Sequence, residues 1–111
     1  MNAMDPLRDE LSQDAMLVHI ESDFEPLLTK FMTNRKKEAV TMREALAQQD
    51  FDTVRKVAHG MKGAGGSYGF DRITEMAAAI EQSAKAQDSA AIESELGQLD
   101  FYFDHVRVVF V

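Results

Sequence analysis

The chain has 111 residues, and its twelve Lys and Arg against nineteen Asp and Glu give a net charge of −7. Such acidity argues against general DNA or RNA binding, which depends on neutralising phosphates. The absence of cysteine excludes disulfides, thiolate metal sites and cysteine nucleophiles. No apolar run approaches the roughly 20 residues of a membrane span, and the acidic start Met1–Pro6 lacks the apolar region of a secretory signal. We expect a single cytoplasmic domain over residues 1–111, with residues 1–10 prone to disorder.

Residues that break helices are rare, which favours long helices along the whole chain. Both prolines lie in the first quarter, and five of the six glycines fall within residues 60–69. A first, short helix is predicted within Leu7–Ile20, although its apolar residues keep no regular helical phase. A second, longer helix follows from about Leu28 to Leu46, with Pro26 tolerated in its first turn.

The next three elements have apolar residues at clear helical spacing. A third helix follows the turn at Asp50, a fourth begins at Asp71 after Gly69, and the N-cap of a fifth is Asp88 or Ser89. Their apolar stripes, in chain order, are Val54, Val57, Ala58, Met61 and Gly65, then Ile73, Met76, Ala77, Ile80 and Ala84, then Ile92, Leu96, Leu99, Phe103, Val106 and Phe110.

The end of the chain has two interpretations. His105–Phe110 continues the last helical stripe but also alternates as a strand does. No stretch predicts a β-hairpin. The pattern therefore predicts an all-α fold, an antiparallel up-and-down four-helix bundle with the additional short N-terminal helix across one end.

One histidine of the third helix lies on the wrong face for the core. On a helical wheel His59 falls about 140° from Val54, almost opposite the apolar stripe. Its ring should therefore point to solvent. The residues beside it on the wheel are three cations and two glycines: Arg55, Lys56, Lys62, Gly63 and Gly66.

The positive charge around His59 favours an anion that is attached to the imidazole or approaches it. An exposed neutral imidazole is nucleophilic at neutral pH. Within residues 53–72, four basic side chains and one acidic one give a local charge of +3, which attracts anions. Each glycine inside a helix costs roughly 1 kcal/mol relative to Ala, and Gly63 would let another protein approach. A phosphoryl group is the obvious anion. The plain alternative is a solvated histidine beside a flexible helix end.

The motif around His59 resembles the histidine-containing phosphotransfer (HPt) domain. The matching residues are Ala58-His59-Gly60-Met61-Lys62-Gly63, then Gly69, then Ile80-Glu81, with Phe31, Met42, Ala45, Leu46 and Asp50 upstream. The resemblance covers about residues 23–105. Met61 and Ile80 stand where the family usually has Leu, and both are conservative core changes.

The resemblance implies that His59 accepts a phosphoryl group on Nε2 from a receiver-domain phospho-aspartate and passes it to a second receiver domain. Lys62 would contact the phosphoryl oxygens, and Gly63 would give the receiver room to dock. We expect Arg55, Lys56 and Gly66 to complete the docking surface. The expected partners are response-regulator receivers and a hybrid sensor histidine kinase. The protein would need no cofactor or metal of its own, with Mg²⁺ in the receiver, and would act as a monomer without autokinase activity.

Other functional classes fit less well. A histidine-kinase dimerisation domain normally has an acidic residue after its histidine, where this chain has Gly60. The glycine run misses the dinucleotide-binding pattern at Tyr68. His19, His59 and His105 lack the spacing of metal ligands. The serious alternative is a helical interaction module in which His59 has no chemical role.

Overall fold

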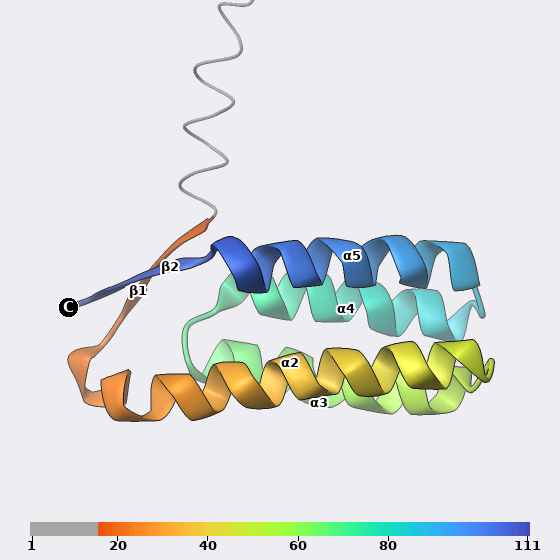
Figure 1. Ribbon diagram of the computed structural model, residues 1–111, viewed down its shortest axis with the longest axis horizontal. Helices are drawn as coiled ribbons and strands as arrows, with labels where there is room; N and C mark the ends of the chain where they lie inside the picture. The colour runs from red at the N-terminus through yellow and green to blue at the C-terminus, as the bar shows by residue number, and fades with distance from the viewer. Residues whose placement is uncertain (1–15) are drawn as a thin grey trace, which may run out of the picture.

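Four α-helices and a two-stranded ribbon form residues 16–111, the part of the chain that the computed structural model describes (Figure 1). In Figure 1 each helix runs back alongside the one before it. The chain is mostly helical, as predicted. The helices are α2 (Glu25–Ala47), preceded by a 3-10 turn at Ser22–Phe24, α3 (Phe51–Ser67), α4 (Asp71–Lys85) and α5 (Ser89–His105).

The ribbon corrects one prediction and decides between the two interpretations of the chain's end. β1 (Leu17–Ile20) pairs in parallel with β2 (Arg107–Phe110). Leu17–Ile20 is therefore not part of a helix, and α5 ends at His105 instead of continuing to Phe110. Both segments are short and rich in β-branched residues, which favour strands, and each supplies the other's backbone partners. Residues 7–15 of the predicted N-terminal helix, and the predicted disorder-prone residues 1–10, lie outside the described residues.

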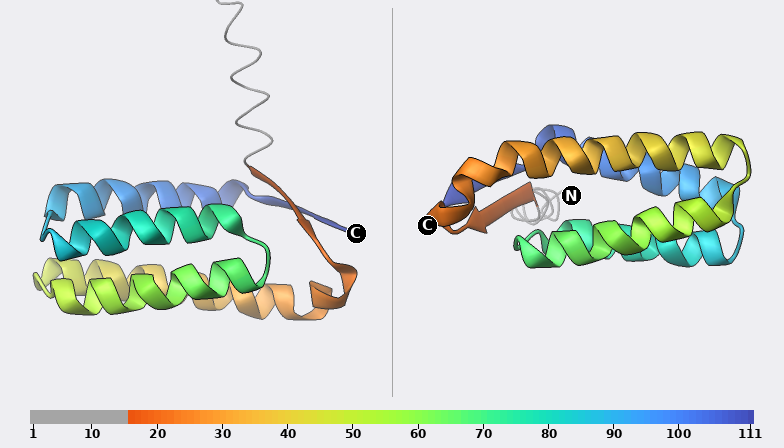
Figure 2. Two further views of the ribbon diagram at one scale, coloured as in Figure 1. Left: turned by 180° about the vertical axis from the view of Figure 1, so that it is seen from behind. Right: turned by 90° about the horizontal axis from the view of Figure 1, so that it is seen from below.

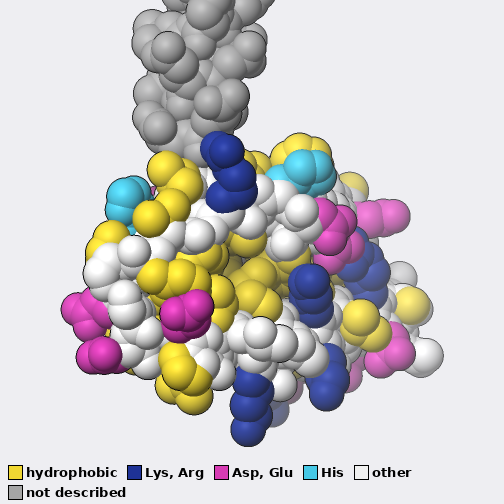
Figure 3. Space-filling view, turned by 60° about the vertical axis from the view of Figure 1, so that its left-hand side comes forward, with side chains coloured by type: hydrophobic (Ala, Val, Ile, Leu, Met, Phe, Trp, Pro, Cys, Tyr) yellow, Lys and Arg dark blue, Asp and Glu magenta, His cyan; other side chains and the backbone are white. Residues whose placement is uncertain are grey.

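The two ends of the described chain meet at this ribbon. The backbone N–H of Val111 donates to the Ile20 carbonyl at 2.9 Å, and the Ser22 N–H and hydroxyl both donate to the Val111 carbonyl. The outer side of the ribbon stays open, since Val109 is 43% and Val111 66% exposed. Figure 3 looks toward this end and shows hydrophobic side chains gathered in the middle of the face, with charged side chains around them.

Capping residues and turns set where α3, α4 and α5 begin. The Asp50 carboxylate accepts the Thr53 N–H at 3.1 Å at the start of α3, and Asp88 accepts the Ala91 N–H at 3.1 Å at the start of α5. Asp88, rather than Ser89, is thus the N-cap. Between α3 and α4 the chain reverses through Gly69, whose φ of 84° favours glycine.

The helices form two layers, α2 with α5 and α3 with α4 (Figure 2, right). The predicted apolar stripes of α3, α4 and α5 meet between them, and Val54, Met61, Ile73, Ile80, Ile92 and Leu99 are fully buried. Phe70 is also fully buried and stacks on Phe31 with ring centroids 5.1 Å apart. No helix within residues 16–111 is both long and apolar enough to cross a membrane.

Close contact between α3 and α4 depends on Gly65. A Cβ at this position would lie 2.9 Å from Thr74 Oγ1 and 3.1 Å from the Phe70 carbonyl oxygen. The Thr74 hydroxyl has little freedom to move, because it donates to the Lys62 carbonyl at 2.8 Å. Gly65 therefore fixes how closely α4 lies against the half of α3 that follows His59.

Gly65→Ala is expected to be less stable than Gly60→Ala by about 1–3 kcal/mol, the usual cost of overpacking. Both changes gain the same helix propensity, and a Cβ at Gly60 would meet nothing within 4 Å. The difference in free energy of unfolding, from urea denaturation, therefore isolates the packing cost. Equal stabilisation by the two changes would show that α3 and α4 do not need a glycine here.

Candidate functional site

His59 stands on the outer face of α3, as its position on the helical wheel predicts. Its side chain is 68% exposed, whereas its neighbours on the apolar stripe, Ala58 and Met61, are fully buried. The buried stripe fixes the rotation of α3 and thereby directs His59 away from the core.

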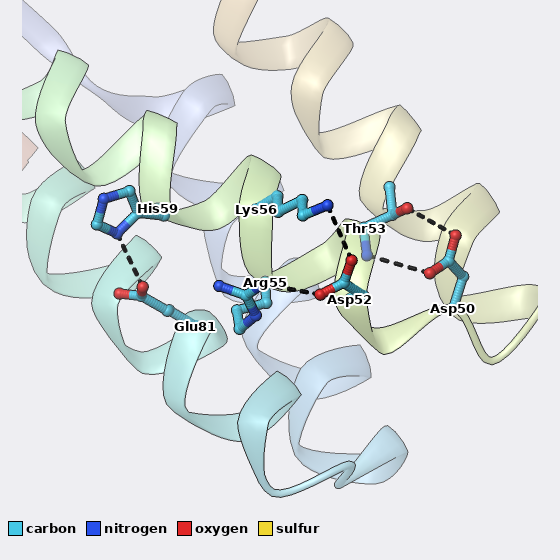
Figure 4. Close-up of polar contacts among 7 residues, drawn as sticks. All are labelled: Asp50, Asp52, Thr53, Arg55, Lys56, His59 and Glu81. Carbon is cyan, nitrogen blue, oxygen red and sulfur yellow. Dashed lines mark hydrogen bonds and ion pairs between the residues drawn. The ribbon is translucent and has the colours of Figure 1, made fainter.

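One carboxylate on α4 holds the ring. The Nδ1 atom of His59 lies 2.9 Å from Oε2 of Glu81 (Figure 4), and the Nζ atom of Lys62 donates to Oε1 of the same carboxylate at 2.8 Å. The Glu81 side chain is only 5% exposed. Each of its two oxygens has a hydrogen-bond partner on α3. A buried carboxylate requires such partners.

The protonation of Glu81 decides the direction of the hydrogen bond to His59. The bond from Lys62, followed by that from His59, outweighs the effect of burial and lowers the pKa of Glu81 from 4.5 to about 2. At neutral pH the carboxylate is ionised and only accepts hydrogen bonds. Nδ1 of His59 must therefore be the donor. In the neutral ring the Nε2 lone pair is then left free, on the side turned away from Glu81 (Figure 4).

Lys62 is fixed at both ends. Its side chain is 36% exposed and bonds to Glu81, and its backbone carbonyl accepts the Thr74 hydroxyl at 2.8 Å. The structure thus brings three residues together, two predicted as site residues and one, Glu81, that the sequence analysis gave no role.

Arg55 and Lys56 lie one turn before His59 but are not free cations. Arg55 Nη2 donates to Asp52 Oδ1 at 2.7 Å, and Lys56 Nζ lies 3.0 Å from Asp52 Oδ2. Hydrogen bonds from Arg55 and then Lys56 hold the pKa of Asp52 below its ordinary value. The local positive charge predicted around His59 is thus partly neutralised by an aspartate that the sequence analysis did not consider.

The predicted glycines leave bare backbone after His59. A Cβ at Gly63 would meet nothing within 4 Å, and one at Gly66 would lie 3.6 Å from Thr74 Oγ1, an ordinary contact. Neither glycine is needed for packing within the described chain. Because Gly63 lies one helical turn beyond His59, a partner could approach the backbone there.

The other histidines are not part of this site. His19 is exposed on β1, and His105 stacks on Phe101 at the end of α5, with its Nδ1 2.8 Å from the Phe101 carbonyl oxygen. Within residues 16–111, no group of three or more His, Asp or Glu side chains could hold a metal ion.

The sequence does carry a signal for Glu81. It lies four residues after Ala77 and three before Ala84, both buried on α4, so it belongs to the apolar stripe of that helix. A charged residue at a core position needs partners, and the cations and histidine of α3 are the nearest available. Asp52 gives a weaker signal, because acidic residues are common in the first turn of any helix.

A family model of the Hpt domain matches residues 26–107, which is most of the chain. The match spans α3 and α4, and therefore His59, Lys62 and Glu81. No curated protein and no solved structure gives a significant match.

Acid should weaken the fold through Glu81. The pKa of Glu81 is about 2 in the folded chain and near 4.5 without its partners. Its ionised form therefore stabilises the fold fully above about pH 4.5, and this contribution is lost as the pH falls toward 2. The free energy of unfolding, from urea denaturation at steps across this range, should fall less steeply in Glu81→Gln than in the wild type. Identical slopes would show that the Glu81 contacts do not depress its pKa.

Proposed function

The chain belongs to the Hpt domain family, whose members act in histidine phosphotransfer within phosphorelays, and from this premise we propose that His59 carries the phosphoryl group. The observation that supports this most strongly is the hydrogen bond between Nδ1 of His59 and the ionised Glu81 carboxylate. It leaves an exposed nitrogen, Nε2, with a lone pair that can act as a nucleophile.

In the first step, the Nε2 lone pair attacks the phosphorus of a receiver-domain aspartyl phosphate. A bond forms between Nε2 and phosphorus, and the bond from phosphorus to the aspartate oxygen breaks, releasing the aspartate carboxylate. No proton has to move. The ring gains positive charge while Nδ1 keeps its hydrogen, and the negative Glu81 carboxylate 2.9 Å away stabilises that charge.

The second step reverses these changes with another receiver domain. An aspartate oxygen of that domain attacks the phosphorus, and the bond to Nε2 breaks with its electron pair returning to Nε2. Because Nδ1 has kept its proton, the leaving group is neutral imidazole and not an anion. Glu81 is therefore a positioning residue, which fixes the tautomer suited to both steps.

Lys62 and Gly63 act beside the reacting nitrogen. Lys62 follows His59 by three residues, which places both on one face of α3, and its ammonium group would contact the phosphoryl oxygens. Gly63 would give the receiver access to the backbone, with Arg55, Lys56 and Gly66 around it. Phosphoryl transfer depends mainly on such positioning and on charge stabilisation. The receiver domain would supply the Mg²⁺.

The partners that this role requires are receiver domains on either side of the relay. We propose that a hybrid sensor histidine kinase supplies the phosphoryl group and a response regulator takes it. The chain would serve as a relay intermediate without autokinase activity, as a single, monomeric domain in the cytoplasm where such partners act.

His59→Gln should abolish phosphorylation by a receiver domain that labels the wild-type protein. Because Gln replaces an exposed side chain, the variant should stay folded, and circular dichroism checks this. The wild-type label should be acid-labile and alkali-stable, as expected of phosphohistidine. Undiminished label in His59→Gln would move the site elsewhere, and no label on either protein from any receiver would favour the inert interaction module.

Gly63→Gln should slow transfer by about tenfold or more, since a displaced partner loses the in-line geometry. Gly97→Gln is the matched control, because a Cβ at Gly97 on α5 also meets nothing within 4 Å. Both changes should stabilise their helices by up to about 1 kcal/mol. Transfer rates from a phosphorylated receiver separate them, and equal rates for the two variants would place the docking surface away from Gly63.

A further inference from the structure

The Asp52 carboxylate divides its two oxygens between the basic residues that precede His59. Oδ1 accepts from Arg55 at 2.7 Å, and Oδ2 lies 3.0 Å from Lys56 Nζ (Figure 4). All three side chains are exposed to solvent, with Asp52 at 60%, Lys56 at 68% and Arg55 at 37%. The two cations are therefore accessible to a partner, but each is already engaged.

Two of these three residues, Asp52 and Arg55, lie beside a place where a partner could enter. Asp52 and Arg55 line a shallow hollow between the start of α3 and the end of α4, and Lys85 lines it from α4. Arg55 precedes His59 by four residues, which places it one turn along the same face of α3. The edge of a protein surface docked over His59 would reach this hollow.

Exchange of ion-pair partners is nearly neutral in free energy at this point. An exposed ion pair contributes little net free energy, so a carboxylate of a docking protein can replace Asp52 on Arg55 or Lys56. The exchange gains little, because one such pair is lost for each one formed. Asp52 also repels the incoming carboxylate. Both effects weaken binding without touching His59.

We propose that Asp52 is an intramolecular competitor that keeps the docking of an acidic receiver surface weak and reversible. This inference rests on the proposed function, which makes a receiver domain the partner at His59. A relay intermediate must release one receiver before the next can dock, and Asp52 holds Arg55 and Lys56 in place between these encounters.

Asp52→Asn tests the proposal, with Asp100→Asn as a matched control. Asp100 pairs with Arg43 at 2.6 Å, and the two side chains are 44% and 42% exposed. This pair joins α2 and α5, the layer opposite α3 and α4 (Figure 2). Both substitutions therefore remove one negative charge and its exposed ion pairing, with two cations for Asp52 and one for Asp100, but they lie on opposite layers of the bundle.

The probe is the receiver domain that labels the wild-type chain fastest among those tested, and isothermal titration calorimetry gives its Kd. At about 50 mM salt, Asp52→Asn should bind about two- to fivefold tighter than the wild type, in line with one exposed pair. Asp100→Asn should bind as the wild type does. Near 1 M salt, where the screening length is about 3 Å, the gain should vanish.

A double-mutant cycle completes the test. In a background of Arg55→Gln and Lys56→Gln, Asp52→Asn should tighten binding less than it does in the wild type, because the cations that it frees are absent. Equal tightening in both backgrounds, equal tightening by Asp100→Asn, or unchanged or weaker binding by Asp52→Asn would overturn the proposal. Labelling of His59 in the wild type is measured separately, so the proposed function survives any of these results.

Discussion

The Glu81 carboxylate is the contact on which both the packing of α3 against α4 and the chemistry of His59 depend. A carboxylate that is 5% exposed is tolerated only when its oxygens are satisfied. Here both partners come from α3, three residues apart and hence on one face of that helix. The contact therefore adds to the buried apolar stripe in setting how α3 lies against α4, and Gly65 permits the short separation between the two helices.

The cations near His59 are paired with two different carboxylates, Glu81 and Asp52. Lys62 is bound to Glu81 at 2.8 Å, so its reach toward a phosphoryl group on His59 competes with that bond. Arg55 and Lys56 are bound to Asp52. The basic face of this acidic chain is thus a set of cations each held by a carboxylate, and a partner must exchange with those carboxylates to use them.

Much of this arrangement could be predicted from local patterns. The apolar spacing predicts the four helices, and the turn at Asp50 and the candidate N-caps Asp88 and Ser89 predict two of their starts. The wheel position of His59 predicts its exposure. The ribbon could not be predicted in the same way, because Leu17–Ile20 finds its partner in Arg107–Phe110. Strand pairing over such a distance has no local signal, although the alternation of His105–Phe110 is compatible with a strand as well as with a helix.

The contacts of the site were harder to predict than its central residue. The position of Glu81 on the apolar stripe of α4 indicates a buried carboxylate, but which face of α3 meets it depends on how the two helices pack. Asp52 carries only a weak signal in the sequence, because an acidic residue in a first helical turn has an ordinary explanation in the helix dipole. The roles of Glu81 and Asp52, which act through other side chains, thus follow mainly from the structure and not from the sequence.

The tautomer of His59 tests the central claim most directly. Long-range ¹⁵N–¹H NMR spectra of histidine-labelled protein, recorded at a pH where the ring is neutral, report which ring nitrogen carries the proton. The account predicts a protonated Nδ1 and a free Nε2 at His59, and loss of this preference in Glu81→Gln. A proton on Nε2 in the wild-type protein would contradict it, since the nitrogen proposed to attack phosphorus would then have no free lone pair.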